Sequence, residues 1–114
     1  MHLAAAAATS LSIAVSPTGA PPWQHATLTC GPVGGTISHR AAACRKLSGM
    51  RAPFAPVPRD AVCTDIYGGP DVARVVGTFR GQHVWAVFRR RNGCEIARWN
   101  AVSFLIGNGE KPIR

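Results

Sequence analysis

Residues 72–89, VARVVGTFRGQHVWAVFR, decide the fold class of this chain. Both halves of the stretch are rich in Val and aromatic side chains, which favour strands, and Arg80-Gly81 between them has the composition of a tight turn. The stretch therefore predicts a β-hairpin that joins Val72–Phe79 to Val84–Arg89.

Shorter segments around the hairpin predict further strands and a helix. Residues 26–30 alternate in polarity, residues 40–47 are rich in helix formers and are followed by Gly49, and three prolines make residues 50–60 an extended connection. The remaining extended or apolar segments are residues 61–67 and 99–106. Four or five strands with one or two short helices indicate a single α+β domain.

Length and composition exclude several classes of protein. The chain has 114 residues, which is enough for one small domain, and 13 Lys+Arg against 5 Asp+Glu give a formal charge of +8. So few carboxylates leave little room for a metal-carboxylate enzyme or an acid/base pair. The sequence contains no catalytic constellation, so we expect neither an enzyme nor a cofactor.

The first 20 residues differ in kind from the rest. They lack Lys, Arg, Asp and Glu, and the apolar run from Leu3 to Val15 is too short to span a membrane. It fits the apolar core of a secretory signal peptide, with a small-residue cleavage site at Thr18-Gly19-Ala20. The sequence thus predicts a signal peptide over residues 1–20 and a mature domain over residues 21–114. A disordered Ala-rich tail is the alternative.

Four cysteines, at positions 30, 44, 63 and 94, agree with secretion. An even number of cysteines in a small secreted chain predicts two disulfides, for which three pairings exist. Zinc requires close ligand pairs such as CxxC, and the spacings of 14, 19 and 31 residues do not provide them. We therefore expect no metal site.

An ordered set of short motifs resembles the Streptomyces subtilisin inhibitor family. The motifs are LTC at 28–30, GGT at 34–36, AAC at 42–44, CTDIY at 63–67, GTFRG at 77–81 and NGC at 92–94. Pro70 and an apolar segment at residues 102–105, which resembles the family's last strand, complete the set. The resemblance covers residues 26–105, and its specificity lies in the order of the motifs.

The resemblance implies a fold and a function. It implies the disulfides Cys30–Cys44 and Cys63–Cys94, a five-stranded antiparallel sheet with helices on one side, and homodimers that meet through their sheets. It also implies a secreted protein that reversibly inhibits serine proteases, chiefly subtilisin-like ones, in the manner of a substrate.

The same resemblance implies a reactive loop whose scissile bond is Asp65–Ile66. Val62 would fill an apolar subsite of the protease, and Ile66 and Tyr67 would cover the leaving side. The reactive-loop residues are Val62, Cys63, Thr64, Asp65, Ile66 and Tyr67, and the supporting residues are Cys94, Asn92 and Pro70.

Asp65 departs from the family pattern, which usually has Met, Lys, Arg or another large residue at this position. A carboxylate in an apolar specificity pocket is costly unless it is paired or protonated. Three readings follow: a target protease with a basic pocket, a weak inhibitor held by Val62, Ile66 and backbone contacts, or a loop that has lost or changed its function.

A second hypothesis uses the arginines that follow the hairpin. Arg89, Arg90 and Arg91 form a local basic cluster beside Trp85. A secreted binding module for an anionic partner would use this cluster. Nucleic-acid binding needs a longer basic stripe, so we expect neither a nucleic acid nor a membrane as partner.

Overall fold

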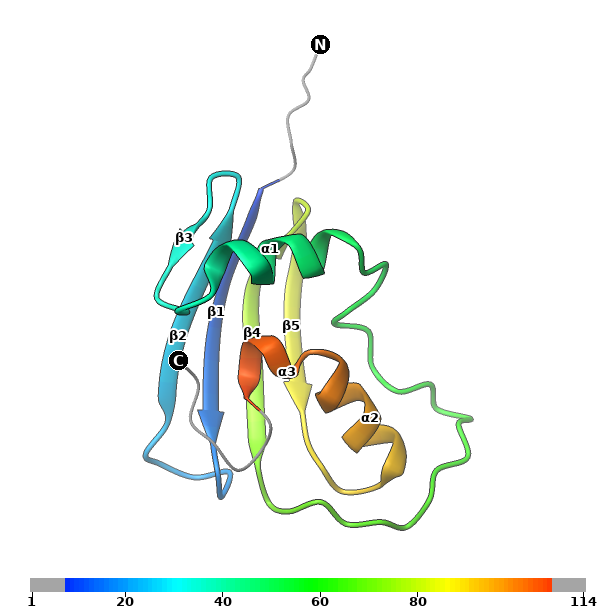
Figure 1. Ribbon diagram of the computed structural model, residues 1–114. Helices are drawn as coiled ribbons and strands as arrows, with labels where there is room; N and C mark the ends of the chain where they lie inside the picture. The colour runs from blue at the N-terminus through cyan, green and yellow to red at the C-terminus, as the bar shows by residue number, and fades with distance from the viewer. Residues whose placement is uncertain (1–7, 108–114) are drawn as a thin grey trace.

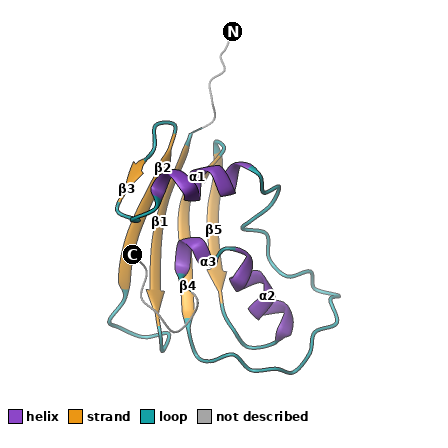
Figure 2. Cartoon of the chain, viewed as in Figure 1, coloured by secondary structure: helices purple, strands orange, loops and turns teal. Residues whose placement is uncertain are grey.

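In the computed structural model, which describes residues 8–107, an antiparallel sheet is covered on one face by helices (Figures 1 and 2). Five strands occur in the order β3-β2-β1-β4-β5. The strands are β1 (Thr9–Ser16), β2 (Gln24–Cys30), β3 (Gly34–Gly35), β4 (Val72–Phe79) and β5 (Gln82–Phe88). The helices are α1 (Arg40–Ser48), α2 (Gly93–Ala101) and α3 (Ser103–Ile106). This arrangement confirms the expected sheet. No helix among the described residues has the length and apolar character needed to cross a membrane.

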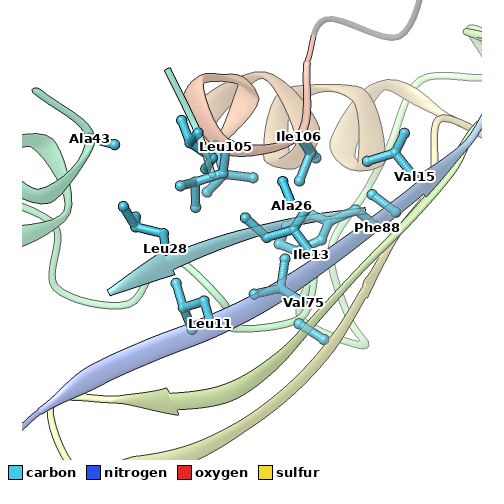
Figure 3. Close-up of a cluster of buried hydrophobic side chains, with 14 of the residues drawn as sticks. Leu11, Ile13, Val15, Ala26, Leu28, Ala43, Val75, Phe88, Leu105 and Ile106 are labelled. Atoms are coloured by element: carbon cyan, nitrogen blue, oxygen red, sulfur yellow. The ribbon is translucent and has the colours of Figure 1, made fainter. Parts of the chain in front are cut away.

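The core lies between the sheet and the helices. Alternate side chains of each strand point to the same face, and Leu11, Ile13 and Val75 are fully buried there beneath Leu105 and Ile106 of α3 (Figure 3). Each such side chain contributes about 1.5–3 kcal/mol through its burial. The opposite face of the sheet bears Ser10, Ser12 and the 71 % exposed Trp85.

The structure places β1 inside the sheet, within the segment that the sequence analysis assigned to a signal peptide. β1 pairs with β2 on one side and with β4 on the other, with Leu11 opposite Leu28 and Ile13 opposite Val75. Cleavage after Ala20 would remove this strand and open both ladders. Alternate side chains of residues 9–16 are buried, as in a strand that turns one face to the core.

The segment that leaves β1 is also ordered. Ser16 is fully buried, and its hydroxyl oxygen accepts hydrogen bonds from the backbone N–H groups of Thr18 at 3.2 Å and Gly19 at 3.0 Å. The proposed cleavage site thus forms the turn that leads to β2. We infer that the folded domain includes residues 9–20. Residues 1–7 lie outside the described residues.

The hairpin of β4 and β5 agrees with its prediction, although β5 starts at Gln82 and ends at Phe88. Phe79 pairs with Gln82 across a turn in which Arg80 and Gly81 both have positive φ angles, +52° and +79°. This is the backbone of a type I′ turn, which matches the twist of the strands. The Arg80 guanidinium donates to the carbonyls of Leu47 and Ser48, both at 2.9 Å, and so caps the end of α1.

Two segments that could have supplied strands, residues 61–67 and 99–106, do not belong to the sheet. Residues 61–67 form an irregular connection, and residues 99–106 lie in the end of α2 and in α3. α2 begins at an N-cap, where the Asn92 side chain accepts from the N–H of Glu95 at 2.9 Å, and its Trp99 is fully buried. The resemblance to a last apolar strand at residues 102–105 is therefore not realised, because Val102 ends α2 and residues 103–105 lie in the short helix α3. β1 and the two-residue β3 complete the sheet in place of these segments.

Candidate functional site

The expected reactive loop is an exposed segment of the long connection between α1 and β4. This connection runs from α1 along the outer side of β5 and returns to β4 past the start of α2 (Figure 1). Three large apolar side chains point into solvent: Val62 is 98 % exposed, Ile66 62 % and Tyr67 65 %. Large apolar side chains gathered at the surface mark contact sites for a partner. We call residues 62–67 the loop.

The N-terminal half of the loop is tied to the start of α2. A disulfide joins Cys63 to Cys94, with 5.3 Å between the Cα atoms, and the N–H of Gly93 donates to the carbonyl of Thr64 at 3.0 Å. One covalent and one hydrogen bond therefore hold the two residues that precede Asp65.

The C-terminal side of the loop is tied to Arg90, the second residue after β5. The N–H of Gly68 donates to the carbonyl of Arg90 at 2.7 Å, and the Arg90 Nε donates back to the carbonyl of Gly68 at 3.1 Å. The Arg90 guanidinium also lies 5.5 Å from the centre of the Trp99 ring. Asp65, Ile66 and Tyr67 thus form an exposed span between two anchors, one at Gly93 and Cys94 and the other at Arg90.

Close approach explains why a glycine follows Asn92. A Cβ atom on Gly93 would collide with the side-chain oxygen of Thr64. Any larger residue would force the loop away from α2 and break the bond between Gly93 and Thr64.

The supporting residues act at different distances from the loop. Cys94 and Asn92 lie at the first turn of α2, where Asn92 caps the helix through Glu95. Pro70 is exposed and follows Gly69, which has a φ of +119°. Asn92 therefore acts on the loop indirectly: it caps α2, and α2 carries Cys94, which is bonded to the loop.

The side chain of Asp65 is exposed, in the middle of the loop. Within residues 8–107, the ion pair present joins Arg91 to Glu95 at 3.4 Å, and Asp65 takes no part in it. Its carboxylate is thus open to a group supplied by a partner.

Arg98 fixes the helix to which the loop is anchored. Its guanidinium donates to the carbonyls of Ala55 and Val87, both at 2.7 Å, and lies 3.9 Å from the centre of the Phe88 ring. Burial lowers the pKa of Arg98 below its ordinary value, while the Glu95 carboxylate acts in the opposite direction. Arg98 therefore joins α2, β5 and the proline-rich segment.

The structure divides the arginine cluster. Arg90 holds the loop, whereas Arg89 and Arg91 line a cavity beside β5. The sequence analysis missed the structural roles of Arg90, Gly93 and Arg98. The motif Asn92-Gly93-Cys94 carried a signal for Gly93, while the arginine contacts depend on segments distant in sequence.

The disulfides agree with the pairing that the resemblance implied. Cys30 bonds to Cys44, which links β2 to α1, and Cys63 bonds to Cys94. The four cysteines are therefore oxidised partners of one another.

A family model described as subtilisin inhibitor-like matches residues 5–91. The chain belongs to the subtilisin inhibitor-like family. The match starts before β1, which agrees with the place of β1 in the folded domain, and it ends before α2. No curated protein sequence matches the chain. Membership of this family supports an inhibitor of subtilisin-like proteases.

Proposed function

We propose that this subtilisin inhibitor-like protein inhibits a serine protease by inserting its loop, residues 62–67, into the active-site cleft. The observation that carries the proposal is the exposed span of Asp65, Ile66 and Tyr67, held between the Cys63–Cys94 disulfide and the Gly68–Arg90 hydrogen bonds. The matched family supports the same function.

The anchors give the loop the properties of an inhibitor. A loop that is already ordered loses little conformational entropy on binding, so more of its contact energy remains as affinity. Its backbone pairs with the edge of a protease strand in the cleft. After cleavage between Asp65 and Ile66, both new ends stay tied to the scaffold, at Cys94 and at Arg90. Religation therefore competes with release, and hydrolysis is slow.

The proposed positions follow from the scissile bond Asp65–Ile66. Asp65 enters the pocket that selects the residue before the cut, and Ile66 and Tyr67 cover the leaving side. Val62, which is almost fully exposed, supplies an apolar side chain to a subsite further from the cut.

The side chain of Asp65 also suggests which class of protease is the target. An acidic side chain matches a protease that cleaves after Asp or Glu, because such a pocket offers cationic or hydrogen-bonding groups to the carboxylate. A subtilisin-like protease, the target that the family supports, would bind mainly through Val62, Ile66 and the backbone.

Secretion and dimerisation belong to the same proposal. Two disulfides in a small domain suit an oxidising compartment. The uncovered face of the sheet carries the exposed Trp85, which suits contact with a second sheet in a homodimer.

A protease panel tests the proposed function. The disulfide-bonded chain is titrated against a subtilisin, a trypsin-like protease and a protease that cleaves after Asp or Glu. We expect tight inhibition of the last, transfer of inhibition to the trypsin-like protease by Asp65→Lys, and no effect of the matched change Asp60→Lys, which lies outside the loop. Absence of inhibition throughout the panel, with the chain shown to be folded, would contradict the proposal.

A further inference from the structure

β5 is the outermost strand of the sheet, and one of its two edges carries no strand (Figure 1). Antiparallel pairs alternate between hydrogen-bonded and non-hydrogen-bonded, and a two-residue turn is flanked by a bonded pair. Counting from Phe79 and Gln82, the backbone groups of every second residue point away from β4. These residues are His83, Trp85 and Val87.

A side-chain contact supports this assignment of outward-pointing backbone groups. The Arg98 Nη1 donates to the carbonyl of Val87 at 2.7 Å from outside the sheet. In the part of the chain that the structure describes, the outward backbone groups of His83 and Trp85 have no partner within the protein. Such an edge is a template for a further strand.

A cavity of about 300 Å³ adjoins this edge. The proline-rich segment lines one side with Pro56 and Val57, and β5 lines the other with Trp85 and Val87. The cavity therefore offers apolar side chains next to a strand edge, together with charged ones, which suits an extended peptide that has both apolar and charged side chains.

Arginines surround one end of the cavity. Arg89 has no ion pair or hydrogen bond with any described residue. Arg91, whose side chain is 63 % exposed, forms an ion pair with Glu95 and with no other described residue. Arg98 also lines the cavity, but its guanidinium already donates hydrogen bonds to two backbone carbonyls. Arg89 and Arg91 together carry one positive charge more than Glu95 balances. Guanidinium groups bind carboxylates with well-directed hydrogen bonds.

We propose that the outer edge of β5, with Arg89 and Arg91, binds an extended acidic peptide segment of a partner protein by strand addition. Backbone hydrogen bonds to His83 and Trp85 provide the pairing, and the arginines select a carboxylate at one end. The strand edge and the apolar walls favour a peptide over a nucleic acid, which needs a longer basic stripe. The site does not use the loop.

Binding of a defined peptide to the full, disulfide-bonded chain tests this site. The probe is an acetylated and amidated hexapeptide, Val-Thr-Val-Thr-Asp-Asp, and its control ends in Lys-Lys. We expect amide NMR shifts at His83, Trp85 and Val87, and an affinity for the acidic probe that is about tenfold higher by calorimetry.

Two matched comparisons separate charge from backbone pairing. The double variant Arg89→Gln, Arg91→Gln is expected to lose the preference for the acidic probe. The control is the double variant Arg45→Gln, Arg59→Gln, which loses the same charge elsewhere and is expected to keep the preference. Methylation of the peptide amides that face β5 abolishes binding, whereas methylation of the alternate amides does not.

Three results would overturn the proposal. One is equal affinity for the acidic and basic probes, and another is binding that survives methylation of the facing amides. The third is binding of heparin or single-stranded DNA through Arg89 and Arg91 while the acidic peptide fails to compete, which would make the cluster a polyanion site. No protease is present, so these outcomes are independent of inhibition.

Discussion

Removal of the Cys63–Cys94 disulfide by Cys63→Ser, Cys94→Ser is expected to have a global and a local effect. The disulfide spans 31 residues. In the chain-entropy account, loss of a cross-link of this span lowers the free energy of unfolding by about 4 kcal/mol. A small domain has about 5–15 kcal/mol in total, so the variant remains folded only with a reduced margin.

The local effect concerns the loop. Without the disulfide, its N-terminal half keeps the single hydrogen bond between Gly93 and Thr64, so local opening becomes more frequent. We expect cleavage between Asp65 and Ile66 by the inhibited protease to become at least about tenfold faster, because a tenfold change needs only about 1.4 kcal/mol of lost tethering.

The second disulfide provides a matched control. Cys30–Cys44 spans 14 residues, and its removal by Cys30→Ser, Cys44→Ser is expected to cost about 3 kcal/mol. Global stability thus falls by a similar amount while the loop keeps its tether. Urea denaturation measures the free energy of unfolding of both variants, and mass spectrometry measures cleavage of the loop. Equal cleavage rates in the two variants would refute the tethering argument, as would a loss below about 1 kcal/mol for the longer span.

Three further predictions concern the scaffold and the anchors. A chain that starts at residue 21 loses three buried apolar side chains of β1 (Leu11, Ile13 and Val15), each with about 1.5–3 kcal/mol of burial, and is expected to be unfolded by circular dichroism; a folded product would contradict the placement of β1. Gly93→Ala pushes Thr64 away and is expected to weaken inhibition about tenfold while the melting temperature changes little; unchanged inhibition would show that this contact does not hold the loop. Arg80→Gly relieves a positive φ but leaves two α1 carbonyls without their donor, so we expect a net loss of about 1–2 kcal/mol in urea denaturation, and a gain in stability would contradict the capping role.

The parts of the fold that could be predicted are those in which a few neighbouring residues favour one backbone conformation. The turn at Arg80-Gly81 set the register of the hairpin, and Gly49 marked the end of α1. The disulfide pairs were not determined by spacing and came from the family resemblance, which the structure then confirmed.

The parts that could not be predicted carry ambiguous local signals. Residues 9–16 alternate between polar and apolar side chains as a strand does, but they follow an Ala-rich run, so the same letters also fit a signal core. Residues 99–106 are a short apolar stretch, which fits a strand or a helix. Asn92 and Glu95, which have the spacing of a helix start, were the signal that favoured the helix.

The order of the motifs predicts a loop at residues 62–67, and the structure shows that this segment is exposed. The contacts that support the segment could not be predicted. The bonds between Gly68 and Arg90, and the contacts of Arg98 with Ala55 and Val87, join residues 11 to 43 positions apart and exist only in the folded chain.

The most direct test of the proposed function is to map the bond that the target protease hydrolyses during long incubation of the disulfide-bonded chain. Mass spectrometry of the products locates the cut. The proposal predicts slow, incomplete cleavage at Asp65–Ile66, with intact and cut forms reaching a constant ratio. Rapid and complete hydrolysis at that bond, or inhibition accompanied by cleavage at a different segment only, would contradict it.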